Sequence, residues 1–315
     1  FTETPLLKRM DAVKDYFIDS WETLKGRNIS EDDQEMLQMK FDKMYTTKDI
    51  YTIYNWMLDD CGCDLLPEVP YEKRKLPYED VFPMLYLKYR LSGGNSTHKN
   101  IKHLVIDEMQ DYTYLQYTIL ESLFHCRMTI LGDRAQTLDT KQQDVLRFLP
   151  KLLGREIRTI EIKKSYRNTL EIARYAEKVS GVSDLELLDR HGKEVVEKTF
   201  NTDTELLDEL VCHLKCPGDF ETAALITTTE EEAFDLSRLL KLRGINVSYV
   251  DRNSSAFKKG LTVTTFYLAK GLEFDQVFAL RGAKENPLKN QAEYICATRA
   301  LHELYVYEIA DSLSK

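Results

Sequence analysis

Residues 104–111, which read LVIDEMQD, decide the fold of this chain. A short apolar run ends there in two adjacent carboxylates, Asp107 and Glu108. A second apolar run, residues 128–131, ends in the dipeptide GD, and a helical stretch over residues 114–124 separates the two runs. Strand–helix–strand alternation of this kind is typical of a buried parallel sheet. We therefore expect the acidic ends of both strands at one edge of such a sheet.

The same alternation returns in the second half of the chain. Short apolar runs and one helical stretch are expected at residues 223–226, 230–242 (the helix), 247–250, 261–265, 276–280 and 303–307. The pattern predicts the α/β class with two parallel sheets and a boundary near Pro150. Residues 1–100 look helical instead, over residues 5–24, 31–44 and 78–87, followed by a surface loop at residues 91–97.

Composition narrows the class of protein. The chain has 315 residues, of which 43% are hydrophobic and 30% charged, which suits about two globular domains. Its 43 basic and 52 acidic side chains leave a net charge of −9. This argues against a protein that only coats nucleic acid, because binding to phosphates favours basic surfaces. No apolar run is long enough to span a bilayer. Six scattered cysteines lack the paired spacing of a zinc module, so we expect reduced thiols and a cytoplasmic protein.

The paired carboxylates have two interpretations. Phosphoryl transfer needs one carboxylate to hold Mg²⁺ and another group to position the attacking water. Asp107 suits the first role and Glu108 the second. In the alternative interpretation, both are acidic caps at the start of the next helix, where the helix dipole favours negative charge. Residues 104–111 by themselves give the two interpretations about equal weight.

Residues 130–136, ILGDRAQ, tip the balance toward phosphoryl transfer. Together with residues 107–111, DEMQD, they resemble motifs II and III of superfamily-1 helicases of the UvrD, Rep and PcrA type. The resemblance implies RecA-like domains that use ATP and Mg²⁺ and move on single-stranded DNA or on a DNA–RNA hybrid. It also implies that Gln136 touches the γ-phosphate and links hydrolysis to the bound strand.

Residues 164–169, KSYRNT, resemble motif IV of the same family. The resemblance implies that Tyr166 stacks on the base and that Arg167 reaches the γ-phosphate. A planar guanidinium suits that role because it can grip phosphate with two parallel hydrogen bonds.

Residues 262–275 and 294–300 resemble motifs V and VI. The resemblance places Gly271 and Glu273 at the nucleotide, with the glutamate on the ribose, and makes Arg299 the arginine finger. Considered without the other motifs, Arg299 could equally be a cation on a helix surface, and Gly271 could equally be an ordinary turn residue. Five motifs in the family's order, over residues 75–310, argue against coincidence.

The motif V variant narrows the resemblance further. Residues 266–269, FYLA, stand where most of the UvrD group has a histidine, and residues 298–302, TRALH, follow in motif VI. Both are most similar to the HelD branch, which implies bacterial RNA polymerase as a partner. The short interval between Arg167 and Leu261 excludes the large extra domain that UvrD and Rep carry there. Lys270 either faces the nucleic acid or is solvated.

No phosphate-binding loop of the form GxxxxGK(S/T) occurs in the sequence. Family order places that loop before motif II, so we expect a C-terminal fragment of a longer ATPase that is inactive alone. A degenerate homologue retained for binding is the alternative. The expected organisation is a mainly helical region (1–100), an incomplete first RecA-like domain with motifs II and III (101–150), and a second RecA-like domain with motifs IV to VI (151–315).

Two functions remain open at this point. The first is an enzyme: part of an ATP-dependent helicase or translocase of superfamily 1. The second is a non-catalytic module that docks on RNA polymerase through its helical residues 1–100. The acidic net charge and the absent extra domain favour the module. The joint presence of Asp107, Glu108, Gln136, Arg167 and Arg299 favours the enzyme, because a binding module needs none of them together.

Overall fold

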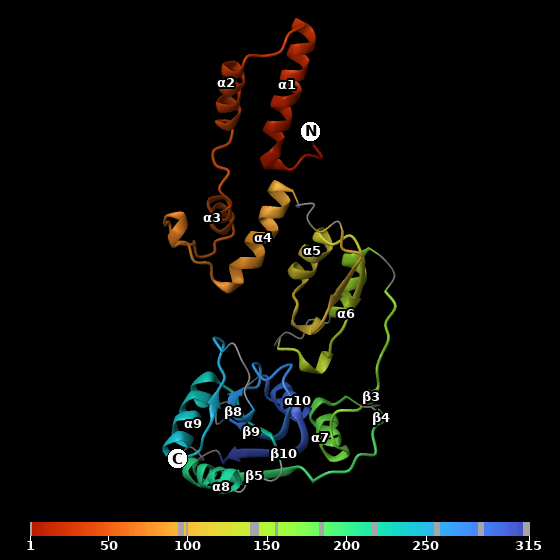
Figure 1. The fold of residues 1–315 in the computed structure, drawn as a ribbon, viewed down its shortest axis with the longest axis vertical. Helices are drawn as coiled ribbons and strands as arrows, with labels where there is room; N and C mark the ends of the chain where they lie inside the picture. The colour runs from red at the N-terminus through yellow and green to blue at the C-terminus, as the bar shows by residue number, and fades with distance from the viewer. Residues whose placement is uncertain are drawn as a thin grey trace. The chain divides into compact units, whose positions relative to one another are not determined.

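The computed structural model describes residues 2–93, 98, 100–138, 145–154, 157–182, 186–215, 220–254, 259–282 and 287–310. The chain forms two compact units (Figure 1). Unit 1 comprises residues 1–107, 112–131 and 145–155, and unit 2 comprises residues 108–111, 132–144 and 156–315. The two short loops that follow the first two strands therefore pack with unit 2, although the strands themselves belong to unit 1.

Unit 1 begins with helices and ends with a small sheet between helices. Its elements are η1 (Leu6–Lys8), α1 (Arg9–Lys25), α2 (Glu31–Asp42), α3 (Ile50–Asp60), η2 (Tyr71–Lys73), α4 (Tyr78–Ser92), β1 (His103–Ile106), α5 (Tyr114–Leu123), β2 (Arg127–Ile130) and α6 (Val145–Leu153). The helical N-terminal region predicted from the sequence is confirmed. Leu91 and Ser92, expected in a loop, continue α4 instead, and residues 94–97 of that loop lie outside the described part of the chain.

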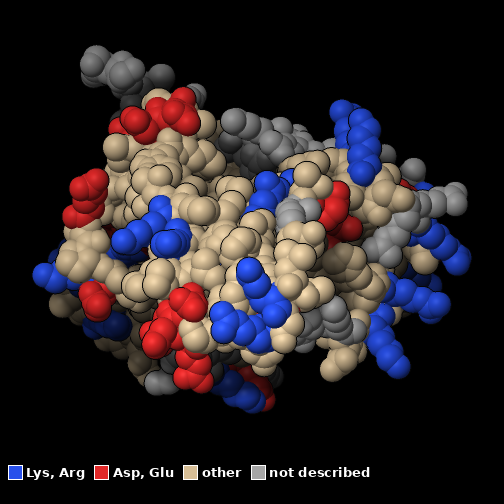
Figure 2. Space-filling model, turned by 90° about the horizontal axis from the view of Figure 1, so that it is seen from above, with Lys and Arg blue, Asp and Glu red and all other residues tan. Residues whose placement is uncertain are grey.

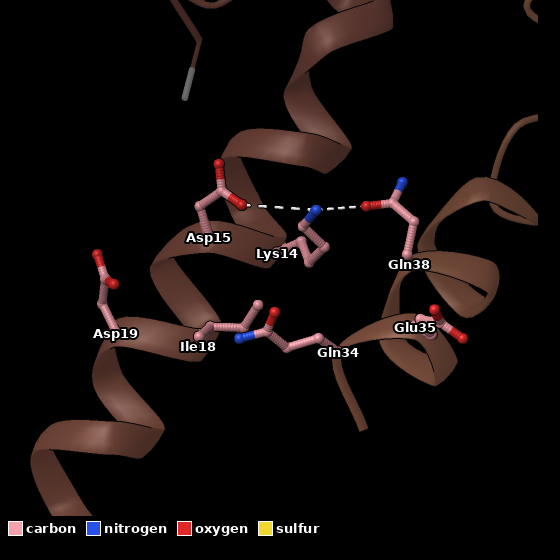
Figure 3. A pocket seen from close by; sticks show the side chains of 7 residues that line it. All are labelled: Lys14, Asp15, Ile18, Asp19, Gln34, Glu35 and Gln38. Carbon is pink, nitrogen blue, oxygen red and sulfur yellow. Dashed lines mark hydrogen bonds and ion pairs between the residues drawn. The ribbon is translucent and has the colours of Figure 1, made fainter. Parts of the chain in front are cut away.

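Helices α1 and α2 pair without a hydrophobic core. Both are described in full, and neither contains a buried residue. Ser30 caps α2 by accepting a hydrogen bond from the Asp33 amide, and Lys14 of α1 donates to Gln38 of α2 (Figure 3). A pocket between the two helices is lined by Lys14, Asp15, Ile18, Asp19, Gln34, Glu35 and Gln38. Six of these seven side chains are polar or charged, so polar contacts dominate this pairing.

A small core holds α3 against α4. Tyr51, Tyr54, Leu58 and Leu66 are buried and pack with Met84 and Leu87. The Tyr54 hydroxyl donates to Asp80 at 2.7 Å, which satisfies the polar end of a ring that is otherwise enclosed.

The sheet of unit 1 consists, within the described residues, of β1 and β2 in parallel, with Ile106 opposite Ile130. Both strands therefore end at one edge, as the sequence predicted. Parallel sheets are normally covered on both faces, yet the Val105 side chain is 60% exposed. Over the part of the chain that the structure describes, this sheet is therefore uncovered at Val105.

Unit 2 is built around a larger sheet. Its elements are η4 (Met109–Asp111), η5 (Arg134–Gln136), β3 (Lys164–Ser165), α7 (Leu170–Ser180), β4 (Glu186–Leu187), β5 (Val196–Phe200), α8 (Asp203–Lys215), β6 (Thr222–Thr227), α9 (Glu230–Leu242), β7 (Ser248–Tyr249), β8 (Gly260–Thr265), β9 (Phe274–Arg281), α10 (Lys289–Arg299) and β10 (Ala300–Ile309). Six strands pair in the order β5-β10-β9-β6-β8-β7, and every pair is parallel.

Side chains of the central strands alternate between two cores. Ala224 and Ile226 of β6 face α7 and α10, whereas Leu225 between them faces α8 and α9. Strands β9 and β10 alternate in the same way, so helices cover both faces of the sheet, and α8 and α9 appear together at one side of it in Figure 1. This period of two over buried parallel strands confirms the α/β class and is consistent with a RecA-like arrangement.

Candidate functional site

Glu108 follows β1 in a conformation that side chains seldom adopt. Its φ is +53°, the one positive value at a non-glycine residue in the described chain. The neighbouring Gln110 donates a hydrogen bond to the Glu108 carboxylate at 2.5 Å. Such left-handed backbone costs free energy and persists only where surrounding contacts impose it.

Gln110 joins this loop to the loop that follows β2. Its side-chain oxygen accepts a hydrogen bond from the Asp133 amide at 3.0 Å. Gly132 lies so close that a Cβ atom there would stand 2.5 Å from Gln110 Oε1 and 2.7 Å from the Met109 backbone nitrogen. The glycine is therefore required by the close approach of the two loops.

Asp133 is the centre of a hydrogen-bond network in this second loop. One of its carboxylate oxygens accepts from the Ala135 amide at 3.0 Å, and the other accepts from Gln136 Nε2 and the Tyr294 hydroxyl, both at 2.8 Å. Tyr294 belongs to α10, so the network fixes Gln136 against the helix that ends in Arg299. Gln136 itself is buried, at 7% exposure.

Arg299 is enclosed at the C-terminal end of α10, with 3% of its surface exposed. Its hydrogen bonds are long and go to neutral oxygens: Gln136 Oε1 at 3.3 Å, Thr298 Oγ1 at 3.2 Å and the Leu272 carbonyl at 3.4 Å. The buried Nε has no hydrogen-bond partner. Arg299 is therefore not the surface cation that the sequence left open.

The charged groups around Arg299 shift its pKa in opposite directions. Burial and the nearby Arg167 lower the pKa of Arg299 below its ordinary value, while the carboxylates of Glu108, Glu273 and Asp133 oppose that shift. The guanidinium thus lies among acidic groups from three separate loops, and those groups partly offset the cost of its burial.

Glu273 and Arg167 pair with each other at 2.7 Å, both a little under half exposed. Glu273 immediately precedes β9 and Arg299 immediately precedes β10, and the first residues of these strands, Phe274 and Ala300, lie opposite each other in register. The parallel pairing therefore brings the motif V and motif VI residues side by side.

Asn168 ties the motif IV loop to α10. Its buried side-chain amide donates to the Ala297 carbonyl at 3.1 Å and to the Ala300 carbonyl at 2.6 Å. These carbonyls flank Arg299 at the end of the helix, where backbone oxygens lack helical partners. Next to it, Tyr166 is 64% exposed, and the Lys164 ammonium lies 5.5 Å from its ring centroid.

Two motif V residues bear on alternatives that the sequence left open. Gly271 has φ +76°, so its turn favours glycine, and an added Cβ would meet no atom within 4 Å. The Lys270 side chain is only 9% exposed and forms an ion pair with Asp111 at 2.6 Å. The interpretation of Lys270 as a solvated surface lysine is therefore wrong.

Asp107 is exposed where β1 ends. Among the described residues, no group of three or more His, Cys, Asp or Glu side chains is placed to hold a metal ion. Magnesium at phosphoryl-transfer sites is held by one or two carboxylates together with phosphate oxygens and water. Asp107 is a single exposed carboxylate, which is the ligand type that such sites use.

Unit 2 brings together Glu108, Gln136, Arg167, Glu273 and Arg299. Four residues that hold them in place had no predicted role: Gln110, Asp133, Asn168 and Tyr294. All four lie within the quoted motifs, so membership of a motif was the available signal. The sequence placed Asp133 at the edge of the sheet, but nothing in a single sequence shows which of these polar side chains are buried.

Comparison with known proteins adds structural neighbours. No family model and no curated protein matches the chain. The C-terminal domain of a possible DNA helicase from Lactobacillus plantarum WCFS1 matches at 25% identity over 46% of this chain and 88% of that one, with a TM-score of 0.37. The PRRSV helicase matches at 16% identity over 84% of this chain and 46% of its own, with a TM-score of 0.39. The chain is similar to parts of two helicases.

No helix in the described part of the chain has both the length and the apolar character that crossing a bilayer requires.

Proposed function

We propose that this chain is part of a superfamily-1 helicase-type motor that couples ATP hydrolysis to movement on nucleic acid, and that unit 2 reads the terminal phosphate of the nucleotide. The order of the five motifs supports the proposal. The observation that carries it is the buried Arg299 side chain, whose Nε has no hydrogen-bond partner.

A buried guanidinium that lacks a partner is costly, because its N–H groups have given up water without full replacement. All the hydrogen bonds described for Arg299 go to neutral oxygens at 3.2 Å or longer. A phosphate oxygen would supply the missing acceptor and, unlike the present partners, a negative charge in direct hydrogen-bond contact. Gln136, hydrogen-bonded to Arg299, would meet the same phosphate.

The remaining site residues would bind the metal ion, the attacking water or the nucleotide. Asp107 would hold Mg²⁺ and Glu108 would orient the attacking water, while Arg167 would exchange its Glu273 partner for phosphate. Tyr166, Gly271 and Glu273 would line the base and ribose. When bound, Mg²⁺–ATP supplies the reactive phosphoryl group and neutralises its charge.

Titration with inorganic tripolyphosphate tests the phosphate site directly. The Nε–H signals of arginine side chains, observed by NMR and assigned with Arg→Lys variants, report each guanidinium separately. We expect the Arg299 and Arg167 signals to shift together and saturate. The exposed Arg174 on α7 serves as the control and should shift only as bulk ionic strength dictates. An Arg299 signal that stays fixed while Arg174 moves contradicts the proposal.

Within this class, we propose the HelD branch, supported by the motif V variant at residues 266–269. A second candidate function follows from the same assignment: unit 1 docks on bacterial RNA polymerase through α1 and α2. The observation that favours it is the exposure of large apolar side chains on helices that contain no buried residue. These are Tyr16, Phe17, Leu24, Met36 and Met39. All five lie on the paired helices α1 and α2, and contiguous exposed apolar surface marks interaction sites.

Single-stranded DNA binding at two salt concentrations separates the two functions. Basic and acidic side chains are interspersed on the face seen in Figure 2, among the residues that are described there. A motor with local phosphate contacts should lose affinity steeply as salt rises, by about tenfold or more between 50 and 200 mM. Binding to purified polymerase core without any such DNA binding would favour the docking module.

A further inference from the structure

Residues 190–192, which we call the clasp, contact residues 167–170, where motif IV leads into α7. The Arg190 guanidinium donates from Nη1 to the Arg167 carbonyl at 3.0 Å, and the Arg190 carbonyl accepts from the Leu170 amide at 2.8 Å. Gly192 packs so closely on Thr169 that an added Cβ would stand 2.5 Å from its methyl group. Three separate contacts thus fix the four residues that run from Arg167 into α7.

Glu171 anchors the clasp at its other end. Its carboxylate accepts the Gly192 amide and one nitrogen of His191, each at 2.8 Å. The His191 ring also lies 3.0 Å from Asp189. Hydrogen bonding to His191 lowers the pKa of Glu171 to about 2, and the same bond raises the pKa of His191. Glu171 is therefore a carboxylate at neutral and mildly acidic pH, and its pKa is the one that this contact lowers most clearly.

The second half of the Arg190 guanidinium is held by His302, two residues beyond Ala300 in β10. Nη2 lies 2.9 Å from His302 Nδ1. Arginine only donates hydrogen bonds, so Nδ1 must be the acceptor and the ring proton must lie on Nε2. That nitrogen is 3.7 Å from Asp275, and the His302 ring stacks on Phe220. Arg190 therefore links the backbone carbonyl of Arg167 in motif IV to His302 near the start of β10.

We propose that Arg190 is the positioning residue for Arg167, holding its backbone so that the guanidinium is presented beside Arg299. The proposal rests on the phosphate-reading role assigned to unit 2. Arg167 needs such a support because its side chain is nearly half exposed and its ion pair with Glu273 must break for phosphate to bind. Arg190 itself touches no reacting group, so it acts through the Arg167 carbonyl alone.

A double-mutant cycle distinguishes positioning from general stabilisation. Tripolyphosphate affinity is measured by calorimetry for the wild type, Arg167→Ala, Arg190→Ala and the double variant. We expect a loss of about tenfold or more for Arg167→Ala, because hydrogen bonds to charged groups are the strong ones. Arg190→Ala should lose roughly fivefold, and the double variant should be no weaker than Arg167→Ala alone, since residues acting through one another are not additive.

Two further variants complete the design. Arg174→Ala removes one exposed positive charge from α7, whose N-terminus the clasp anchors, and should leave the affinity within about twofold. Arg190→Lys keeps the charge but cannot bridge Arg167 and His302 with a rigid fork, so it should restore only part of the affinity. It also replaces Arg190→Ala in the cycle if that variant proves unfolded by circular dichroism.

The outcomes separate the two levels of the proposal. If Arg167→Ala leaves the affinity unchanged, the phosphate role of unit 2 is wrong. If Arg167→Ala weakens binding but Arg190→Ala does not, or if the two losses multiply in the double variant, the positioning role of Arg190 alone is overturned. Losses that coincide in the single and double variants support it.

Discussion

Arg299→Met is expected to stabilise unit 2 while it removes tripolyphosphate binding. Methionine fills a similar volume without a charge, so the cost of burying a guanidinium whose Nε has no partner disappears. None of the hydrogen bonds described for Arg299 goes to a carboxylate, so the change breaks no direct ion pair, and we expect the removed cost of charge burial to give a gain of about 1 kcal/mol. Affinity for tripolyphosphate should fall by at least about tenfold, because the buried donor set is lost.

The two units give this measurement an internal reference. Both tryptophans, Trp21 and Trp56, belong to unit 1, so tryptophan fluorescence during urea unfolding follows that unit. Far-UV circular dichroism follows both units, so the part of its transition that the fluorescence does not share reports unit 2, which alone should move. Arg174→Met, at an exposed arginine, should change neither transition by more than about 0.5 kcal/mol. A clear destabilisation by Arg299→Met would show that the guanidinium is already well satisfied.

Gly132→Ala is expected to destabilise unit 2 by about 2 kcal/mol, a typical cost of forcing an extra carbon into a packed site. The new methyl would stand 2.5 Å from Met109 Cγ and 2.7 Å from the Met109 backbone nitrogen. The backbone contact cannot be relieved by a rotamer change, so the two loops must separate. That separation would break the hydrogen bond from the Asp133 amide to Gln110.

Met109→Ala supplies the matched background for this test. It removes the side-chain half of the clash and leaves the backbone half. We therefore expect Gly132→Ala to cost less in the Met109→Ala protein than in the wild type, with a difference of about 1 kcal/mol. Equal costs in both backgrounds, or a cost near zero in the wild type, would show that the loops are not in close contact.

The strands and helices that the sequence predicted are those with strong local patterns. Residues 103–106 and 127–130 form the two expected strands, and residues 230–242 form the expected helix with Thr229 and Glu232 in a capping box. Local periodicity suffices for such strands because alternation or runs of apolar residues mark a buried extended segment, and for the helix because its hydrogen bonds and cap join residues three or four apart. Boundaries shifted by a few residues where the pattern was weak, as at Leu91 and Ser92.

The sequence could not predict the burial and the hydrogen-bond partners of the site residues. The sequence allowed Arg299 to be either an arginine finger or a surface cation, and its burial excludes the surface cation. The sequence allowed Lys270 to be a solvated lysine, and its ion pair with Asp111 excludes that. The partners are far apart in the chain: Gln136 and Arg299 are separated by 163 residues, and Asp133 and Tyr294 by 161. No local pattern specifies such pairs, because they form only when separate loops pack together.

The sequence by itself determined the α/β class, the positions of the strands with strong apolar patterns and the acidic ends of β1 and β2, but it missed β3, β4 and β5. The features that it determined follow from the spacing of apolar residues, which local backbone geometry converts directly into elements. Only the tertiary structure decided that the loops after β1 and β2 pack with unit 2 and that Arg299 is buried with an unpartnered Nε. It also decided that residues 190–192 grip the motif IV loop. The physical reason is that burial and long-range hydrogen bonds depend on which surfaces meet, and a side chain's own neighbours in sequence do not fix that.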